Sequence, residues 1–310
     1  MNKNNTCGSD FSLKFFQPRY WLTWLGLFLF FFISLFPTSA RHWLGKKLGS
    51  LIYKKNKKRK HVTSTNLRLC FPELNQQQRE MLTEEHLQWY GCALFDYSFF
   101  FFSSKKRLYR NMYIEGKEHI DQALEQGSNI IILLGHSVFL EFVPVMLGQY
   151  FNTYGSYKPL SNPLIDWMIA RSRCKHVKFV VSREEGMMRL VRELRNQQIL
   201  IFLPDEDHGK EHSSFANFFG LAKSTLNTPA RIARLAKAES FPAMAFYDQG
   251  LKKYKIIIGP SLENYPTKDH EKNTAIMNQG FELLIQQYPA QYMWLMKLFK
   301  TLPDSNKNRY

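Results

Sequence analysis

Short aliphatic runs alternate with helical patterns over the second two-thirds of the chain. Residues 130–134 are consecutive aliphatic residues that predict a buried strand, and residues 199–203 predict a second one. Apolar residues recur at helical spacing over 164–173 and 273–287, and over 291–300 they predict a last amphipathic helix. This alternation is typical of an α/β domain, so we predict a mainly parallel sheet flanked by helices.

The N-terminal part of the chain follows a different pattern. Residues 20–36 carry no charge and are mostly apolar, and Pro18 and Pro37 bracket them. As a helix they would reach about 26 Å, close to the ~30 Å hydrocarbon core of a bilayer. A secretory signal is disfavoured because no clear A-x-A cleavage site follows the apolar run. A membrane anchor at residues 19–37 therefore fits better than a signal peptide or a buried core helix.

The charge of the chain indicates what kind of partner it meets. The sequence has 42 basic and 26 acidic residues, a net charge of +16, which favours acidic partners. Basic residues are dense at 54–60, just after the anchor, and the positive-inside bias places that side in the cytoplasm. Such a run can lie on anionic headgroups. With the anchor next to it, we favour contact with anionic membrane lipids over contact with nucleic acid.

These patterns divide the chain into four parts. We predict a short tail at 1–18, the anchor at 19–37, a basic membrane-proximal segment at 38–65 and a catalytic domain at 66–310. The four cysteines are widely scattered and form no C-x-x-C pair, so they predict neither a zinc knuckle nor a disulfide framework.

Candidate chemistry follows the strand predicted at 130–134. Gly135 and His136 come directly after it, and Glu141 lies five residues beyond the histidine. Neighbours on one face of a helix are three or four residues apart, so this spacing suits a loop histidine and a glutamate in the next helix. There the carboxylate could orient the imidazole as a general base. Taken alone, the spacing is also typical of a histidine near a helix start and a glutamate that faces water.

A second polar loop follows the strand predicted at 199–203. It runs from Pro204 through Asp205 to Gly209, and Arg173 ends the helix predicted between the two strands. In a parallel sheet, ligands bind at the carboxyl ends of the strands. We therefore expect His136, Arg173 and Asp205 to converge with Glu141 on one cleft.

Three functions are compatible with such a cleft. In acyl transfer, His136 would take a proton from an acceptor hydroxyl as that oxygen attacks a thioester, while Glu141 orients the ring. A metal-dependent hydrolase could instead use His136, Asp205 and His208, although no H-E-x-x-H motif is present. A basic membrane-surface module without catalysis would explain the charge but not two polar loops at strand ends. A serine hydrolase is rejected because there is no G-x-S-x-G motif.

An ordered set of motifs behind the anchor resembles one known family. H-x-x-x-x-E alone is a weak signal, but the set covers nearly the whole chain and its order is specific. The motifs are NLRLCFPE at 66–73, GHSVFLE at 135–141, YKP at 157–159, RSR at 171–173, PDEDHG at 204–209, SSFANFF at 213–219 and QYMW at 291–294. The chain thereby resembles the late acyltransferases of bacterial lipid A biosynthesis, the lauroyl and myristoyl group, which are related to the glycerolipid acyltransferases.

This resemblance implies a glycerolipid acyltransferase-like fold, a reaction and a set of roles. His136 and Glu141 match the catalytic dyad, and Arg173 and Asp205 match residues that bind substrate in the active site. The implied reaction transfers an acyl chain from acyl carrier protein to a Kdo-linked, phosphorylated lipid A precursor. It uses a ternary complex and no metal or other cofactor, at the cytoplasmic face of the bacterial inner membrane. Residues 294–300 lack the His-Arg-Arg run of the lauroyl branch, which favours the myristoyl-type step.

Overall fold

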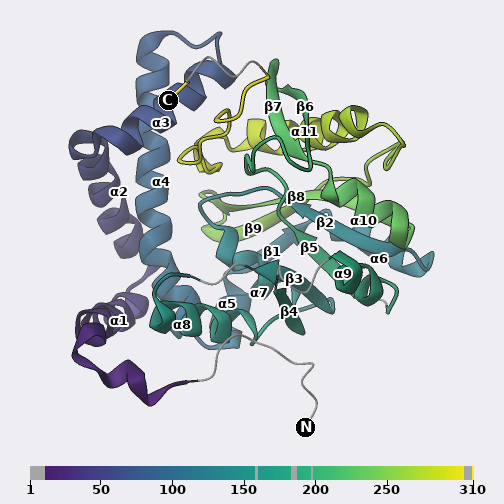
Figure 1. The fold of residues 1–310 in the computed structure, drawn as a ribbon. Coiled ribbons are helices and arrows are strands. Elements are labelled where there is room, and N and C mark those ends of the chain that lie inside the picture. Colours follow the sequence, from purple (N-terminus) through teal and green to yellow (C-terminus); the bar gives the residue numbers. More distant parts are fainter. Residues whose placement is uncertain (1–10, 158–159, 183–186, 197, 304–308) are drawn as a thin grey trace.

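The structure is a computed structural model that describes residues 11–157, 160–182, 187–196, 198–303 and 309–310. In this part of the chain, helices flank a central sheet, and further helices line one side of the molecule (Figure 1). Residues 1–10 of the predicted tail and residues 158–159 of the YKP motif lie outside the described ranges.

The central sheet has a mixed strand direction. Its strands are β1 (Met112–Glu115), β2 (Asn129–Leu134), β3 (Thr153–Tyr157), β4 (Phe179–Ser182), β5 (Ile199–Phe202), β8 (Ala238–Asp248) and β9 (Lys253–Ile258). In the described chain they lie in the order β1-β9-β8-β2-β5-β3-β4. Neighbours are parallel except β8 and β9, which are antiparallel. The predicted α/β class is confirmed, while the prediction of a mainly parallel sheet missed the reversal at β9.

The helices form an N-terminal group and a group around the sheet. The first group comprises the short 3₁₀ helices η1 (Leu13–Phe16) and η2 (Pro18–Tyr20), followed by α1 (Trp21–Leu35), α2 (Thr38–Lys55), α3 (Lys57–Cys70) and α4 (Gln76–Phe102). The second comprises α5 (Lys105–Arg110), α6 (Lys117–Glu125), η3 (Leu140–Phe142), α7 (Val143–Leu147), α8 (Pro163–Arg173), α9 (Met187–Leu194), α10 (Thr228–Ala236), α11 (His270–Gln287) and η5 (Pro289–Gln291). The boundary predicted between residues 65 and 66 falls inside α3.

The sheet is buried on both faces, which explains the unbroken aliphatic run in β2. Ile130 and Ile132 pack in a cluster with residues of α4, α6 and α7, whereas Ile131 and Leu133 pack with residues of α9, α10 and α11. Successive side chains of a strand point to opposite faces, so a strand covered on both sides needs apolar residues at every position. The loop after β2 therefore starts from a rigid position.

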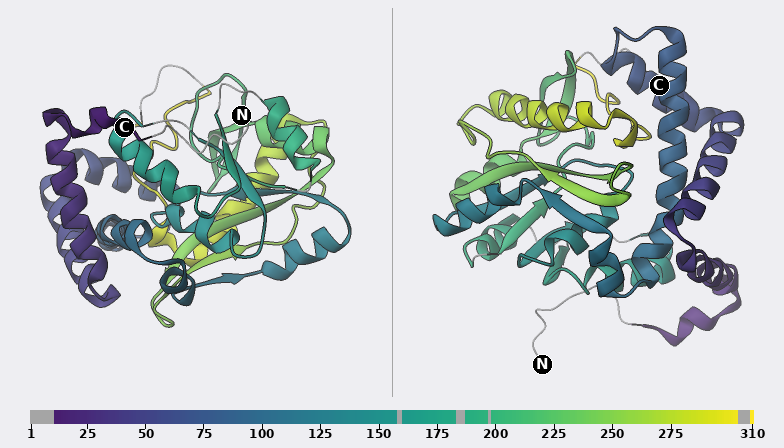
Figure 2. Two further views of the ribbon diagram at one scale, coloured as in Figure 1. Left: turned by 90° about the horizontal axis from the view of Figure 1, so that it is seen from below. Right: turned by 180° about the vertical axis from the view of Figure 1, so that it is seen from behind.

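Close contact between two helices holds the N-terminal group together. α2 and α4 lie side by side along one flank of the molecule (Figures 1 and 2). A Cβ atom on Gly91 would collide with the carbonyl oxygen of Gly45, so glycine is required where the two helices approach. Arg41 Nε donates to Asp96 Oδ1 at 2.8 Å, and both side chains are almost completely buried. This ion pair fixes α2 against α4.

The predicted anchor is a helix with an exposed apolar surface. The segment Pro18–Leu35 is long and apolar enough to cross a membrane, and 11% of it is buried within the structure. Large apolar side chains such as Leu22, Leu25 and Phe28 are more than half exposed on α1. α1 also contacts the start of α8, where Asn162 Nδ2 donates to Thr23 Oγ1 at 3.3 Å. Length, composition and exposure are those expected of a membrane-associated helix.

Two segments depart from the sequence-based prediction. Residues 291–300 do not form the predicted amphipathic helix but a series of turns, because other groups hold their backbone. Asn66 Nδ2, for example, donates to the carbonyl oxygens of Trp294 and Met296, both at 2.7 Å. The SSFANFF motif opens a separate hairpin of β6 (Ser213–Phe218) and β7 (Leu221–Leu226), which was not predicted.

Candidate active site

The backbone around His136 is held in place at the carboxyl end of β2. The His136 amide donates to Asp205 Oδ2 at 2.8 Å, and the His136 carbonyl accepts from the amide of Met293 at 3.0 Å. A Cβ atom on Gly135 would come within 2.3 Å of Cε of Met244, so a larger residue would require the end of this flexible side chain to move. The histidine predicted after a buried strand is thus at the expected place, with its main chain fixed on both sides.

The side chain of His136 is paired with Asp205. β2 and β5 are neighbouring parallel strands, so the loops that follow them meet at one edge of the sheet. Asp205 Oδ1 lies 2.5 Å from His136 Nδ1, and the carboxylate is 2% exposed whereas the ring is 20% exposed. Since Nδ1 is engaged, Nε2 is the ring nitrogen without a hydrogen bond from any residue of the described chain. A partly accessible ring held in this way can take up a proton at Nε2.

The electrostatics of this pair follow from burial and from the mutual attraction of the two groups. Burial lowers the pKa of His136, but the Asp205 carboxylate outweighs burial and raises that pKa above its ordinary value. Burial raises the pKa of Asp205, but His136 outweighs it, so the pKa of this carboxyl lies below its ordinary value. Asp205 therefore stays ionised and stabilises a proton on the ring.

Glu141 pairs with Arg173 in the structure, whereas the sequence predicted a contact between Glu141 and His136. Glu141 lies in η3, directly before α7, as the spacing predicted, but its carboxylate turns to Arg173 at the end of α8. Arg173 Nε donates to Glu141 Oε2 at 2.8 Å, and Arg173 Nη2 pairs with Glu141 Oε1. In the described structure no hydrogen bond joins Glu141 and His136. The reason is geometric: a guanidinium fork engages both carboxylate oxygens, while Asp205 already occupies Nδ1.

Tyr292 completes the surroundings of Asp205. Its hydroxyl donates to Asp205 Oδ2 at 3.0 Å, and the tyrosine is fully buried. An isolated backbone bridge between Ser137 and Tyr292 links this segment to the histidine loop. The QYMW motif was noticed in the sequence, but no spacing rule connected it with His136.

The remaining polar residues of the PDEDHG loop do not gather into a metal site. Asp207 accepts hydrogen bonds from the amide and the hydroxyl of Thr301, at 2.6 and 2.7 Å. His208 faces Glu206 at 3.7 Å, and in the described residues no group of three or more His, Cys, Asp or Glu side chains is arranged to hold a metal ion. The arrangement of His136, Asp205 and His208 proposed for a hydrolase is therefore absent from that part of the chain.

Comparison with known proteins identifies the family. The family model for bacterial lipid A biosynthesis acyltransferases matches residues 9–301. The chain belongs to this family. It is 32% identical to a lipid A biosynthesis acyltransferase of Haemophilus influenzae, with 96% of this chain and 93% of that protein covered. It is 31% identical to the lipid A biosynthesis lauroyltransferase and 30% identical to the palmitoleoyltransferase of Escherichia coli, each over 97% of this chain and 98% of the relative.

The protein is thus an acyltransferase of lipid A biosynthesis, as the ordered motifs predicted. The family match includes all four predicted site residues, and the structure brings them together as two ion pairs, His136 with Asp205 and Glu141 with Arg173. The relatives carry the names of more than one acyl donor, so family membership leaves the acyl chain open.

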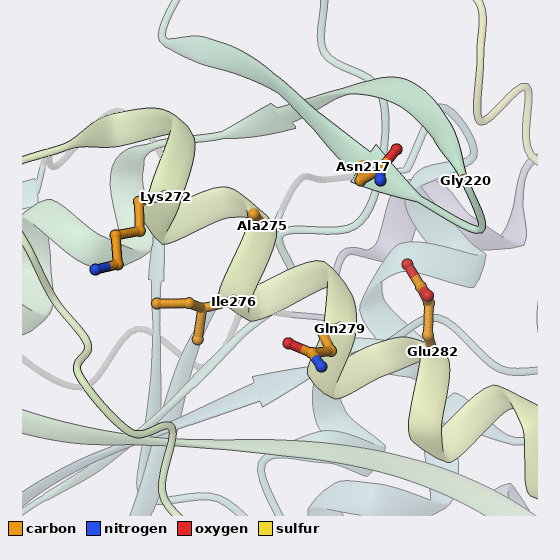
Figure 3. A pocket seen from close by; sticks show the side chains of 7 residues that line it. All are labelled: Asn217, Gly220, Lys272, Ala275, Ile276, Gln279 and Glu282. Atoms are coloured by element: carbon orange, nitrogen blue, oxygen red, sulfur yellow. The ribbon is translucent and has the colours of Figure 1, made fainter.

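A pocket lies away from the four predicted site residues. It has a volume of about 330 Å³ and lies between α11 and the β6–β7 hairpin (Figure 3). Its walls include Lys272, Gln279 and Glu282 from α11 and Asn217 from β6, and none of the predicted site residues lines it. Cys70 and Cys92 are free and buried.

Proposed function

We propose that this acyltransferase transfers a fatty acyl chain from acyl carrier protein to a hydroxyl group on a hydroxyacyl chain of a Kdo-linked lipid A precursor. His136 acts as the general base and Asp205 orients it. The single observation that carries this proposal is the Nδ1–Asp205 hydrogen bond, which leaves Nε2 of a partly exposed ring for the acceptor hydroxyl. Donor and acceptor bind together, so the acyl group passes directly between them.

The chemistry follows from this geometry. Nε2 of His136 takes the proton of the acceptor hydroxyl while that oxygen attacks the thioester carbonyl. The tetrahedral intermediate carries a negative oxygen, and the imidazolium carries the proton beside Asp205. When the C–S bond breaks, the thiolate leaves and the imidazolium returns the proton to it, which gives an ester and a free thiol. A positioned general base contributes about 10² to 10⁴ in rate.

We assign the second ion pair to binding of the acceptor. Arg173 is 28% exposed while its guanidinium is held by Glu141, so it has a fixed orientation and still reaches solvent. Guanidinium groups bind phosphate well, and the proposed acceptor is phosphorylated. Glu141 then acts by holding Arg173 rather than by orienting His136.

The partners and the location follow from charge and from the N-terminal helix. Acyl carrier protein is acidic and the acceptor is phosphorylated, and the net charge of +16 suits both. The apolar segment Pro18–Leu35 and the basic residues after it support attachment to the inner membrane, with the catalytic domain on the cytoplasmic face. The missing His-Arg-Arg run supports a myristoyl-type donor. No metal or other cofactor enters these steps.

The test uses the purified full-length protein in detergent. It is incubated with Kdo-linked lipid A precursor and a mixture of acyl carrier protein thioesters, with and without EDTA, and products are read by mass spectrometry. We expect one acyl chain to be added, with EDTA having no effect. His136→Ala should abolish the product, whereas His270→Ala, an exposed histidine at the start of α11, should not.

Three results would contradict the proposal. Full activity of His136→Ala would show that His136 is not the general base. Activity lost with EDTA and restored by zinc would favour a metal-dependent enzyme. Absence of product with every thioester, combined with tight binding of lipid or nucleic acid, would favour a binding module.

A further inference from the structure

Helix α1 packs against the catalytic domain along one of its faces. It lies beside α8 and the end of α4 (Figure 1). Trp24 and Leu27 pack against an apolar cluster at the start of α8, the ring of Phe31 contacts that of Phe102 in α4, and Ser34 is 1% exposed. These four positions of α1 are three or four residues apart, so they form one stripe on the helix. The contact therefore runs along the length of α1.

Both ends of this helix are held by the same domain. On its N-terminal side, the ring centre of Phe15 in η1 lies 6.4 Å from that of Trp167 in α8, and Phe15 is buried. On its C-terminal side, Arg107 Nη1 of α5 donates to the carbonyl oxygen of Ser34 at 2.9 Å. A helix that crosses a bilayer has ~30 Å of hydrocarbon between its two ends. Phe15 would then lie on the opposite side of the membrane from Trp167, and the observed contact could not form.

Helix α8 cannot follow α1 into the hydrocarbon. Arg171 is exposed, and its guanidinium carbon lies 5.6 Å from the centre of the Trp167 ring. A charged side chain at the centre of a bilayer costs about 2.5 kcal/mol or more. The contact between Phe15 and Trp167 therefore lies at the membrane surface or in water, on the same side as the catalytic domain.

The outward face of α1 has the composition of a surface that contacts lipid. Leu22, Leu25, Leu29 and Phe32 are three or four residues apart, and each is between 45% and 80% exposed. Exposed tryptophans lie at the start of α1, at Trp21, and on α2. Tryptophan is enriched where a protein meets the boundary between acyl chains and headgroups.

Basic residues flank this apolar face. Arg19 precedes the helix, and Lys105 and Lys106 are the first residues of α5, which contacts the C-terminal end of α1; all three are exposed. The sequence contains no aspartate or glutamate from residue 11 to residue 72. An apolar face with cations and no anions beside it matches one leaflet of a bilayer with anionic headgroups. An apolar protein partner would give no reason for this excess of positive charge.

We propose that α1 lies within the cytoplasmic leaflet of the inner membrane without crossing it, so that both of its ends stay on the cytoplasmic side. Its outward face contacts acyl chains, and the basic residues at its two ends contact anionic headgroups. The inference rests on the membrane attachment proposed above but is independent of the role of His136.

This placement bears on the acceptor site. Helix α8 runs from the contact with α1 to Arg173, the residue that we assign to the acceptor. Trp167 and Arg173 are six residues apart, which is ~9 Å along a helix. The contact with α1 therefore holds the acceptor-binding end of the site close to the leaflet that contains a lipid acceptor.

The first test determines on which side of the membrane the N-terminal end of α1 lies. The full-length protein is produced in a Gram-negative host with Lys14→Cys, an exposed position of η1, or with Glu125→Cys, an exposed position of α6. A membrane-impermeant maleimide is added to spheroplasts, whose periplasmic face is outside, or to inverted inner-membrane vesicles. Mass spectrometry of the peptide that carries each position reads the labelling. We expect both positions to be labelled in inverted vesicles and neither in spheroplasts.

Three results would contradict the inference, and they can be told apart. Labelling of Lys14→Cys only in spheroplasts, with Glu125→Cys labelled only in inverted vesicles, would show that α1 spans the membrane, while the attachment stands. Protection of Lys14→Cys in both preparations would place the N-terminal end within the bilayer. Recovery of the wild-type protein in the soluble fraction after cell lysis would refute the membrane attachment itself.

A second test measures the packing of α1 on α8 in the membrane. Thr23→Cys combined with Asn162→Cys replaces two side chains whose polar atoms are 3.3 Å apart, so oxidation in inverted vesicles should link them. Leu22→Cys combined with Asn162→Cys is the matched control, because Leu22 is 80% exposed on the outward face. The linked peptides are identified by mass spectrometry. We expect the link in the first pair and its loss in the control, whereas no link in either pair, or equal linking in both, would overturn the inference.

Discussion

Replacing the fully buried Lys223 of β7 by methionine should stabilise the protein. Burial lowers the pKa of Lys223 from 10.5 to about 8, although Asp205 and Asp207 favour the charged form. One pKa unit is worth ~1.36 kcal/mol, so below pH 8 the charged lysine costs the folded state about 3 kcal/mol. Methionine has a similar length and carries no charge. We therefore expect the free energy of unfolding of Lys223→Met at neutral pH to be about 3 kcal/mol higher than that of the wild-type protein.

The sign of the pH dependence provides the check. Between about pH 8 and 10.5 the unfolded chain binds a proton at Lys223 that the folded chain does not, so wild-type stability rises with pH in this window relative to Lys223→Met. Urea unfolding followed by tryptophan fluorescence, at several pH values, measures both proteins. Their difference cancels the titration of all other groups, and Lys253→Met serves as the exposed control. Equal stability at neutral pH, or a difference that does not shrink as the pH rises, would refute the reasoning.

Three further predictions follow from the ion pairs. Asp205→Asn should lower the acylation rate by about 10² to 10⁴ and move the acidic midpoint of the pH–rate profile to lower pH, because Asp205 raises the pKa of His136. Glu141→Gln should leave this midpoint in place; a movement equal to that of Asp205→Asn would show that Glu141 orients the ring after all. Asp96→Ala should destabilise the protein by about 3 to 5 kcal/mol in urea unfolding, because it leaves the buried Arg41 without a counter-charge. An unchanged unfolding midpoint would contradict that assignment.

The sequence predicted the elements that have a strong periodic signal. The strand at 130–134 needed apolar residues on both faces, and the helix at 273–287 had a clear apolar stripe, so both were found. The reversal of β9 could not be found, because a buried strand has the same composition in either direction. The β6–β7 hairpin turns at Phe219 and Gly220, both with positive φ. Asparagine usually precedes glycine in such a turn. Because phenylalanine stands in that position here, the sequence did not predict the turn.

The segment at 291–300 shows why periodicity alone can mislead. Its apolar residues do recur at helical spacing, but a helix would have to satisfy its own carbonyl groups. Here the side chain of Asn66 donates hydrogen bonds to two of these carbonyl groups. The backbone of Tyr292 forms a β-bridge with Ser137. These partners lie far away in the sequence, so no local pattern could predict the contacts with them. The same long-range contacts bring Tyr292 to Asp205, and the prediction therefore missed both the shape of the segment and its place in the site.

The pairing within the site was decided by strand order rather than by spacing along the chain. His136 has two carboxylates within reach of its loop, and the sequence made Glu141 the obvious partner because it is five residues away. Asp205 is 69 residues away but follows the neighbouring parallel strand, which places it at the same edge of the sheet. Glu141, at the start of the next helix, faces α8 and takes Arg173 instead. The short H-x-x-x-x-E spacing therefore places the glutamate against Arg173, whereas the strand order determines which acid holds the histidine.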